Sequence, residues 1–419
     1  MRIQTLLNHC HPLKSFVYIK DELQTHGDRV EVIVTIKPRK NGNVICSGCN
    51  CTRTVYDHLK EREFSFVPLW NIPVTFRYRM RRVDCPECGV KVEKVPWAEG
   101  KSQTTKAYQI FLAGWAKKLS WSDVARSFGS SWDTVFRSVK MVVEYGLQHR
   151  DLNGVTAIGV DEIQYAKGHQ YLTLVYQIDA GSRRLLFVGK DRTCKTLLRF
   201  FYEFGKERTA LLQFICSDMW KPYLKVIRKK APLALNILDR FHIVKKITEA
   251  VNKVRVEEVK RLRREGYEED VLKNTKYCFL KNPENLTEKQ KLKLDDVLQY
   301  NLKTVRAYLL KESFQLFWNY KSAFWAEWYL KKWCNRAMRS KLDPIKDFVK
   351  TIRRHQPLIL NWFKAKKQYS SGVVEGLNRK VNLVTRKSYG FRSYEVLKIA
   401  LFHTTGSLPE PSLKHTFHQ

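Results

Sequence analysis

The order of predicted strands and helices between residues 155 and 239 constrains the fold of this 419-residue chain more than any other feature. Apolar and polar residues alternate over three segments joined by short turns, and helix patterns then alternate with two further apolar runs. The five predicted strands occupy 155–161, 171–179, 184–189, 211–217 and 233–238. Tight turns predict an antiparallel meander for the first three strands, and helical crossovers predict parallel strands for the last two.

The first, fourth and fifth of these strands are predicted to end at Asp161, Asp218 and Asp239, respectively. The strand order is that of a ribonuclease H-like sheet, in which the ends of strands one and four lie side by side. Asp161 and Asp218 are therefore expected to converge, whereas Glu162 should point to the other face. Two such carboxylates can hold Mg²⁺ together with water and phosphate. Taken alone, Asp218 and Asp239 can also be explained as helix N-caps.

A third acid for such a site is predicted at Glu375, in a late helix with an apolar stripe. The neighbouring stripe of this helix is polar and holds Glu375, Asn378, Arg379, Asn382 and Arg386. One acid among amides and guanidinium groups suits a metal-bound DNA backbone. A first-turn acid that complements the helix dipole is the simpler explanation.

Four of the ten cysteines form two Cys-x-x-Cys pairs, Cys46 with Cys49 and Cys85 with Cys88. A two-residue spacer lets both thiolates bind one ion, so the pairs predict one tetrahedral Zn²⁺. Four thiolates leave no open coordination position, which makes this zinc structural. The residues between the pairs are predicted to be strands, as in a zinc ribbon. Cys51 is a nearby alternative ligand, and four buried free thiols are the simpler alternative.

A helix-turn-helix is predicted after this zinc-binding region. A helix over 104–118 precedes two further helices, one capped by Ser120 or Ser122 and one by Ser130 or Ser131. This pattern places the last helix in the major groove of DNA, although ordinary helical bundles share it. The candidate base-facing residues are Ser131, Trp132, Thr134 and Arg137.

Composition supports a nucleic-acid partner. The net charge of +35 predicts attraction to polyanions, and 44% hydrophobic residues exclude a disordered basic tail. No apolar run reaches the ~18 residues of a membrane span, and no secretory signal is recognisable, so we expect a soluble intracellular protein. We expect a multidomain α+β and α/β chain: a zinc-binding domain (1–100), a helix-turn-helix domain (101–150), and a catalytic domain (151–247 and 368–419) interrupted by a helical insertion (248–367).

The insertion is basic and rich in aromatic residues. At helical spacing most of these aromatics are expected in a core. Stacking on an exposed base is the alternative.

These motifs resemble the DDE transposases of the bacterial insertion-sequence family ISL-three, over nearly the whole chain. The resemblance rests on the paired cysteines, the helix-turn-helix and the stretches 159–162, 218–223, 239–242, 371–380 and 386–392. One departure is Gly372, where relatives often carry Asn. The resemblance implies that Asp161, Asp218 and Glu375 bind two Mg²⁺ or Mn²⁺ ions, and that the helical insertion is a feature of the family.

The resemblance also implies an activity. The protein would bind terminal inverted repeats in double-stranded DNA through its first two domains, with Arg379 and Arg386 as further DNA contacts. Two-metal phosphoryl transfer would cleave the element ends and join each 3′-OH to target DNA. Joining two ends calls for a homodimer, expected in the bacterial cytoplasm at the nucleoid. The alternatives are a non-catalytic DNA-binding regulator and a nuclease that acts on RNA or hybrids.

Overall fold

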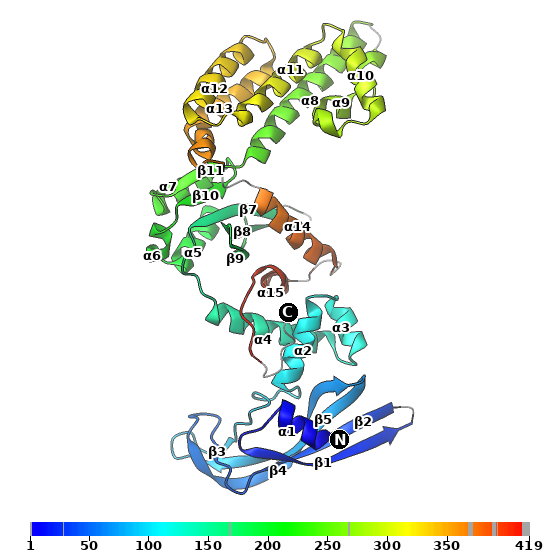
Figure 1. Ribbon diagram of the computed structural model, residues 1–419, viewed down its shortest axis with the longest axis vertical. Coiled ribbons are helices and arrows are strands. Elements are labelled where there is room, and N and C mark those ends of the chain that lie inside the picture. Colours follow the sequence, from blue (N-terminus) through cyan, green and yellow to red (C-terminus); the bar gives the residue numbers. More distant parts are fainter. Residues whose placement is uncertain are drawn as a thin grey trace. The chain divides into compact units, whose positions relative to one another are not determined.

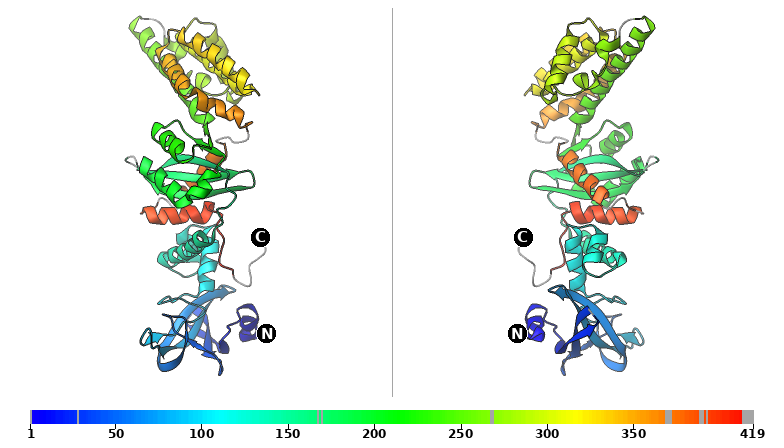
Figure 2. Two further views of the ribbon diagram at one scale, coloured as in Figure 1. Left: turned by 90° about the vertical axis from the view of Figure 1, so that its left-hand side faces the viewer. Right: turned by 90° about the vertical axis from the view of Figure 1, so that its right-hand side faces the viewer.

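The computed structural model describes residues 2–412 except 28, 167, 169, 267–268, 368–371, 388–390 and 392. Ser371, the stretch 388–390 and Arg392, which belong to motifs discussed above, lie outside the described residues. The chain forms two compact units (Figures 1 and 2). We call Met1–Asp151 with Asn382–Gln419 the N-terminal unit and Leu152–Val381 the central unit. None of the described helices is long and apolar enough to cross a membrane.

The N-terminal unit begins with a mixed β-sheet. Its elements are α1 (Ile3–Cys10), β1 (Phe16–His26), β2 (Arg29–Pro38), β3 (Val44–Ile45), β4 (Thr52–Leu69), β5 (Ile72–Asp84) and β6 (Lys91–Val92). The strand order is β1-β2-β5-β4-β3, with β6 paired to β5. Trp97 packs edge-on against Phe16, Phe64 and Tyr78 in the core of this sheet. These large aromatic contacts bury the face that the alternating pattern predicts to be apolar.

Three helices follow: α2 (Lys106–Ala116), α3 (Trp121–Ser127) and α4 (Trp132–His149). Ser120 caps α3 by accepting from Asp123 N, and Ser131 caps α4 by accepting from Thr134 N. The structure thus selects one of the two serines predicted at each cap. Between these helices Gly129 has φ +58°, a left-handed conformation that favours glycine.

The C-terminal helix α15 (Tyr394–Thr405) packs on α4 in the N-terminal unit. At Gly146 of α4 a Cβ would lie 2.6 Å from Leu408 Cβ, so the missing side chain admits the segment after α15. The predicted boundary, which placed all of 368–419 in the catalytic domain, differs from this division. The division instead falls within α14 (Gly372–Lys387), between Val381 and Asn382.

The stability of the N-terminal unit is expected to fall in mild acid because of His403 on α15. Burial lowers the pKa of His403 from 6.5 to about 3, and the charges of Lys117 and Lys387 add to this. The folded state therefore keeps the imidazole neutral, while the unfolded chain binds a proton below about pH 6.5. Stability is full above that pH and is lost as the pH falls toward 3, by about 2 kcal/mol at pH 5.

Thermal unfolding of His403→Leu between pH 7 and pH 5 checks this expectation. The variant should lose part of the pH dependence that the wild type shows, whereas His58→Asn, at an exposed histidine, should keep it. Equal slopes in wild type and His403→Leu would contradict the assignment.

The central unit is built on one five-stranded sheet of order β11-β10-β7-β8-β9. The strands are β7 (Ala157–Ala166), β8 (Gln170–Asp179), β9 (Ser182–Lys190), β10 (Phe214–Ser217) and β11 (Leu235–Leu238). The first three pair antiparallel, and β10 pairs parallel with both β7 and β11. The predicted meander and parallel pair are confirmed. The predicted end of the first strand at Asp161 is wrong, because β7 continues to pair with β8 as far as Ala166.

Helices cover this sheet. On one face α5 (Cys194–Phe204), α6 (Lys206–Ala210) and α7 (Lys221–Lys230) enclose an apolar core that includes Val160 of β7. The other face receives α14, in front of the sheet in the right-hand view of Figure 2. A Cβ at Gly159 would collide with Val374 of α14. Glycine at this position therefore allows the helix to lie directly on β7.

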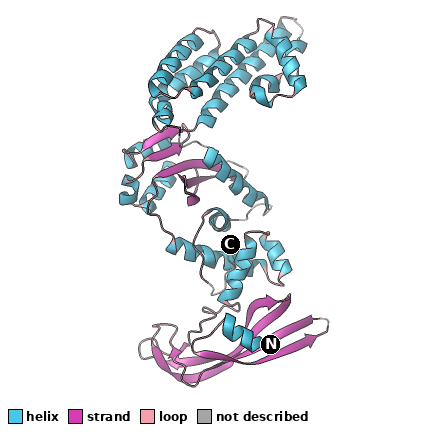
Figure 3. Cartoon of the chain, viewed as in Figure 1, coloured by secondary structure: helices cyan, strands magenta, loops and turns pink. Residues whose placement is uncertain are grey.

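Between β11 and α14 the chain forms a helical insertion (Figure 3). It comprises α8 (Arg240–Arg264), η1 (Glu269–Leu272), α9 (Lys276–Leu280), η2 (Pro283–Asn285), α10 (Glu288–Leu298), α11 (Lys303–Gln315), η3 (Leu316–Asn319), α12 (Ala323–Met338) and α13 (Asp343–Lys364). Phe314, Phe317, Trp318 and Trp333 are buried in it, as most of its aromatics were predicted to be. The Asn361 side chain of α13 donates to Asn236 O of β11 at 2.8 Å. This bond ties the insertion to the sheet.

Candidate functional site

Acidic side chains lie on β7, directly after β10 and β11, and in the first turn of α14. Strand alternation sends Val160 into the core beneath α5 and α7, so Asp161 projects toward α14. There Asp161 Oδ2 accepts from Asn378 Nδ2 at 2.5 Å, and Asn378 Oδ1 in turn accepts from Tyr176 OH at 2.7 Å. Burial raises the pKa of Asp161, and the negative charge of Asp239 contributes. A positive charge would therefore be stabilising beside Asp161.

Asp239 lies at the centre of these charge interactions. It follows β11 and caps α8, accepting from Phe241 N at 2.7 Å, which confirms the predicted N-cap. Its second oxygen accepts from His242 Nδ1 at 2.8 Å, and this bond raises the pKa of His242. Burial and the charge of Asp239 raise the pKa of Glu375 on α14. Asp239 thus interacts with both Asp161 and Glu375.

Asp218 is engaged differently. Its Oδ1 accepts from Trp220 N at 2.9 Å and its Oδ2 accepts from Arg192 at 2.9 Å. Arg192 also forms an ion pair with Glu162 at 2.8 Å and stacks over the Trp220 ring at 4.4 Å. Trp220 itself is the N-cap of α7, so the alternative explanation of Asp218 as an N-cap does not hold.

Arg192 joins two carboxylates that are only 10% and 15% exposed, Glu162 and Asp218. Burial and the charge of Asp218 raise the pKa of Glu162 to about 7. Replacing Arg192 with methionine is expected to destabilise the fold by about 1–3 kcal/mol, because two partly buried carboxylates lose their cation. Arg192 is one-third exposed, which places the effect below that of a fully buried pair.

Chemical denaturation of Arg192→Met beside Arg199→Met checks this expectation. Arg199 also lies over an aromatic ring and pairs with a glutamate, but both groups are 51% exposed. Its loss should cost less than about 0.5 kcal/mol. Equal effects of the two substitutions would show that the Arg192 bridge adds no stability.

The three predicted acids thus lie in one unit, and Asp161 and Asp218 lie at the side of its sheet where β10 and β11 end. We call this side, with Asp161, Asp218 and Asp239, the acidic edge. The predicted acids do not form a closed ligand set. Among the described residues, no three carboxylate oxygens of this edge lie within 4.8 Å of one another. Sequence reasoning gave Asp239 only a capping role and gave none to His242. Their i, i+3 spacing after a strand was the available indication.

The four paired cysteines do come together. All four Sγ atoms lie within 4.8 Å of one another, and Cys49 and Cys85 are 3.6 Å apart. A Cβ at residue 48 would lie 2.8 Å from Cys88 Sγ, so Gly48 lets the two Cys-x-x-Cys turns approach. Arg53 Nε donates to Cys85 Sγ at 3.2 Å and lowers the pKa of that thiol to about 6. Such a set of thiolates beside a cation can hold a metal ion.

A second group near these cysteines consists of Cys49, Cys51 and Glu87, also within 4.8 Å of one another. Cys51 is exposed, whereas Cys46 and Cys85 are buried. The four paired cysteines therefore form the better enclosed metal-binding group of the two.

The residues predicted to contact DNA lie on helices. Ser131 and Trp132 are exposed at the start of α4, and Trp132 stacks on Phe136. Thr134 is half-buried beside them, and Arg137 is exposed and pairs with Asp133. Arg379 and Arg386 are exposed on α14, with Arg379 one turn after Glu375. These positions are open to a ligand.

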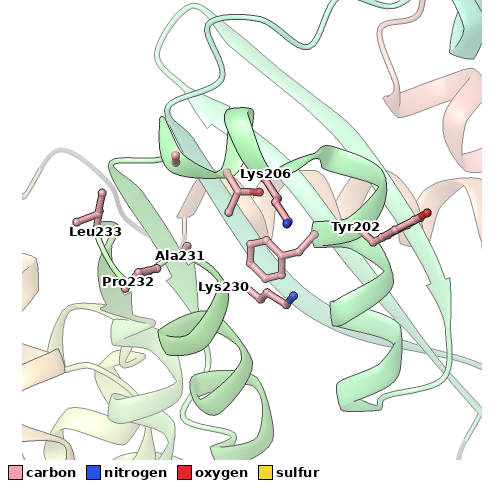
Figure 4. A pocket seen from close by; sticks show the side chains of 9 residues that line it. Tyr202, Lys206, Lys230, Ala231, Pro232 and Leu233 are labelled. Atoms are coloured by element: carbon pink, nitrogen blue, oxygen red, sulfur yellow. The ribbon is translucent and has the colours of Figure 1, made fainter.

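An apolar pocket of about 340 Å³ lies away from the acids (Figure 4). Its lining includes Thr209 and Ala210 before β10, and Pro232 and Leu233 before β11. Asp218 and Asp239 follow the same strands at their opposite ends. The pocket is therefore separate from the acidic edge.

Comparisons with known proteins place the chain in a family. A family model of transposases, the DDE transposases of the ISL3 type, matches residues 158–401, more than half of the chain. The chain belongs to this family. It is similar to the transposase for insertion sequence element IS1557 of Mycobacterium tuberculosis, with 29% identity over 96% of this chain and 95% of that protein. It is also similar to the transposase for insertion sequence element IS1001 of Bordetella parapertussis, with 25% identity over 84% of this chain and 86% of that protein.

Proposed function

We propose that this protein cleaves DNA at the ends of an insertion sequence and joins the freed 3′ ends to target DNA. The observation that supports the proposal is that the charge of Asp239 acts on both Asp161 of β7 and Glu375 of α14, where Val374 of α14 lies against Gly159 of β7. The sheet order, with three antiparallel strands followed by two parallel ones, supports a ribonuclease H-like catalytic domain. Membership of the transposase family supports the same reaction.

The donor set fits divalent metal ions. Burial and like charge raise the pKa of both Asp161 and Glu375, which is the electrostatic condition that a bound cation relieves. We propose Asp161, Asp218 and Glu375 as the ligands of two Mg²⁺ or Mn²⁺ ions, with Asp239 as a fourth candidate. Such ions activate the attacking oxygen and stabilise the leaving oxygen of a phosphodiester.

The protein's own residues hold these acids in place. Asn378 donates to Asp161 and is itself fixed by Tyr176, so the Asp161 carboxylate has one orientation. His242 donates to Asp239 in the same way. Arg379 and Arg386 follow Glu375 along α14 and offer positive charge to a DNA backbone.

We assign DNA recognition to the N-terminal unit. The cysteine cluster is proposed to hold one structural Zn²⁺, and α2, α3 and α4 to act as a helix-turn-helix that binds the terminal inverted repeats. Because two DNA ends are joined in one reaction, the working form is proposed to be a homodimer. We place the protein in the bacterial cytoplasm, with its DNA at the nucleoid.

The test uses the purified full chain and the DNA that flanks its own gene. With Mg²⁺, we expect breaks that leave 3′-OH ends at a pair of inverted repeats, and joined products with added target DNA, both mapped by sequencing. Specific binding without breaks in Mg²⁺ or Mn²⁺ would favour the non-catalytic regulator. Cleavage of an RNA–DNA hybrid in preference to duplex DNA would favour the nuclease.

A further inference from the structure

An aromatic stripe lies exposed on α12 of the helical insertion. Phe324 is 69% exposed, Trp325 is 54% exposed and Trp328 is 43% exposed. Their rings contact one another, with centroids 5.4 Å apart for Phe324 and Trp325 and 6.0 Å apart for Trp325 and Trp328. Exposed aromatics in contact with one another are unusual on a surface without a partner.

The three aromatic residues of the stripe do not belong to the face of α12 that packs in the core. The buried residues of α12 are Ala326, Leu330, Trp333, Cys334 and Ala337. At 100° per residue, Phe324, Trp325 and Trp328 lie on the opposite side of the helix from this packed face. Trp333, on the packed face, donates its indole N–H to Leu310 O at 3.1 Å. Trp333 thus anchors one side of the helix in the core, and the aromatic stripe lies on the side that is exposed to solvent.

Positive charge continues the stripe along the helix. Lys332 Nζ lies 3.8 Å from the centroid of Trp328. Lys321 before the helix and Arg339 at its C-terminal end are also exposed. The single acid of α12, Glu327, is paired with Lys331 at 2.8 Å. An exposed aromatic surface bordered by cations suits a ligand with π faces and negative charge.

We propose that this stripe binds unpaired nucleotides of DNA, with bases stacking on Trp325 and Trp328 and phosphates meeting Lys332. Stacking of bases on aromatic side chains within a positively charged groove is the general mode of single-strand binding. A second copy of this chain is disfavoured as the occupant, because it carries a net charge of +35 that is repelled by the basic stripe.

The insertion is well placed for such a role. Its first helix, α8, begins directly at Asp239, and its last helix, α13, is bonded to β11 through Asn361. A strand held on α12 is therefore held by the same compact unit that carries the acids. The inference rests on the proposed DNA-processing function and adds the form of DNA that this unit recognises.

Photocrosslinking of the full chain tests the proposal. The probe is a DNA duplex that carries a short single-stranded flank with 5-iodouracil, and the control is the same sequence fully paired. We expect a crosslink in the tryptic peptide 322–331, which holds Phe324, Trp325 and Trp328, and a much weaker one with the paired control. Crosslinks confined to other peptides would overturn the proposal while leaving DNA binding intact.

Paired substitutions give a second readout. Trp325→Ala with Trp328→Ala should weaken binding of the flanked probe at least about fivefold and leave the fully paired duplex unchanged. Tyr202→Ala, at a tyrosine that is 87% exposed on α5, should change neither. Equal affinity of wild type and double variant for the flanked probe would reject the proposal, as would a double variant that changes only the oligomeric state. Failure of the wild type to bind either DNA would instead count against the proposed function.

Discussion

Asp161→Asn is expected to lower DNA cleavage by roughly 10³-fold, the scale on which one electrostatic group at a reacting centre contributes. The amide keeps the size of the side chain and can still accept from Asn378. Folding should survive, because burial already disfavours the charged form of Asp161 in the metal-free protein. Lost activity together with an equal or slightly higher Tm is therefore the expected result. Cleavage assays and thermal unfolding in the absence of divalent metal measure the two effects.

Asp179→Asn is the matched control for this substitution. Asp179 ends β8 in the same sheet and accepts from Thr156 Oγ1 at 2.5 Å, a structural contact. Its replacement should lower the Tm and leave cleavage at the wild-type rate per folded molecule. An active Asp161→Asn protein would remove Asp161 from the catalytic site and favour the regulator as the function.

The same assay separates the two strand-end aspartates. Asp218→Asn and Asp239→Asn change one carboxylate each, and Asp218 is bound to Arg192 whereas Asp239 is bound to His242. If Asp218 is a ligand, Asp218→Asn should match the loss in Asp161→Asn. A severe loss only in Asp239→Asn would transfer that role to Asp239.

Local sequence patterns predicted the strands of the five-stranded sheet well. Strand alternation located β8 and β9, and short apolar runs between helix patterns located β10 and β11. The helix N-caps were equally predictable from sequence, since the side chains of Thr193 and Ser131 each accept a hydrogen bond from the backbone N–H three residues later. These features depend on neighbours in sequence, which is why the sequence alone specifies them.

Features that depend on distant packing were not predictable. No local pattern shows that α15 and the segment after it pack on α4, because the close approach of that segment depends on a glycine at 146 and a leucine at 408. The parallel pairing of β2 with β5 is equally non-local. At the acidic edge, the partner of Asp218 depends on Arg192, which reaches it only in the folded sheet, whereas His242 lies three residues after Asp239 and could have been found from that spacing.

The cysteine cluster gives the second large expected effect. Cys85→Ser is expected to abolish binding of one Zn²⁺ per chain and to unfold the end of the sheet around β3 and β6. Structural zinc supplies about 10–16 kcal/mol of apparent binding free energy in zinc-finger peptides, more than a small domain's whole stability. Around Cys85 the apolar core is small, with Val44 and Val83 the buried aliphatic residues. Metal analysis and limited proteolysis of the full chain measure the two losses.

Cys51→Ser decides which cysteines are the ligands. Cys51 lies two residues from Cys49 and its Sγ is 3.7 Å from Cys49 O, but it is exposed and outside the group of four. The Cys51→Ser protein should therefore keep its zinc and its resistance to protease. If Cys51→Ser loses zinc as fully as Cys85→Ser does, the group of Cys49, Cys51 and Glu87 shares in binding the ion. Wild-type protein free of zinc after purification without chelators would instead mean that the cluster holds no zinc, and that the Arg53 hydrogen bond stabilises the Cys85 sulfur without a metal.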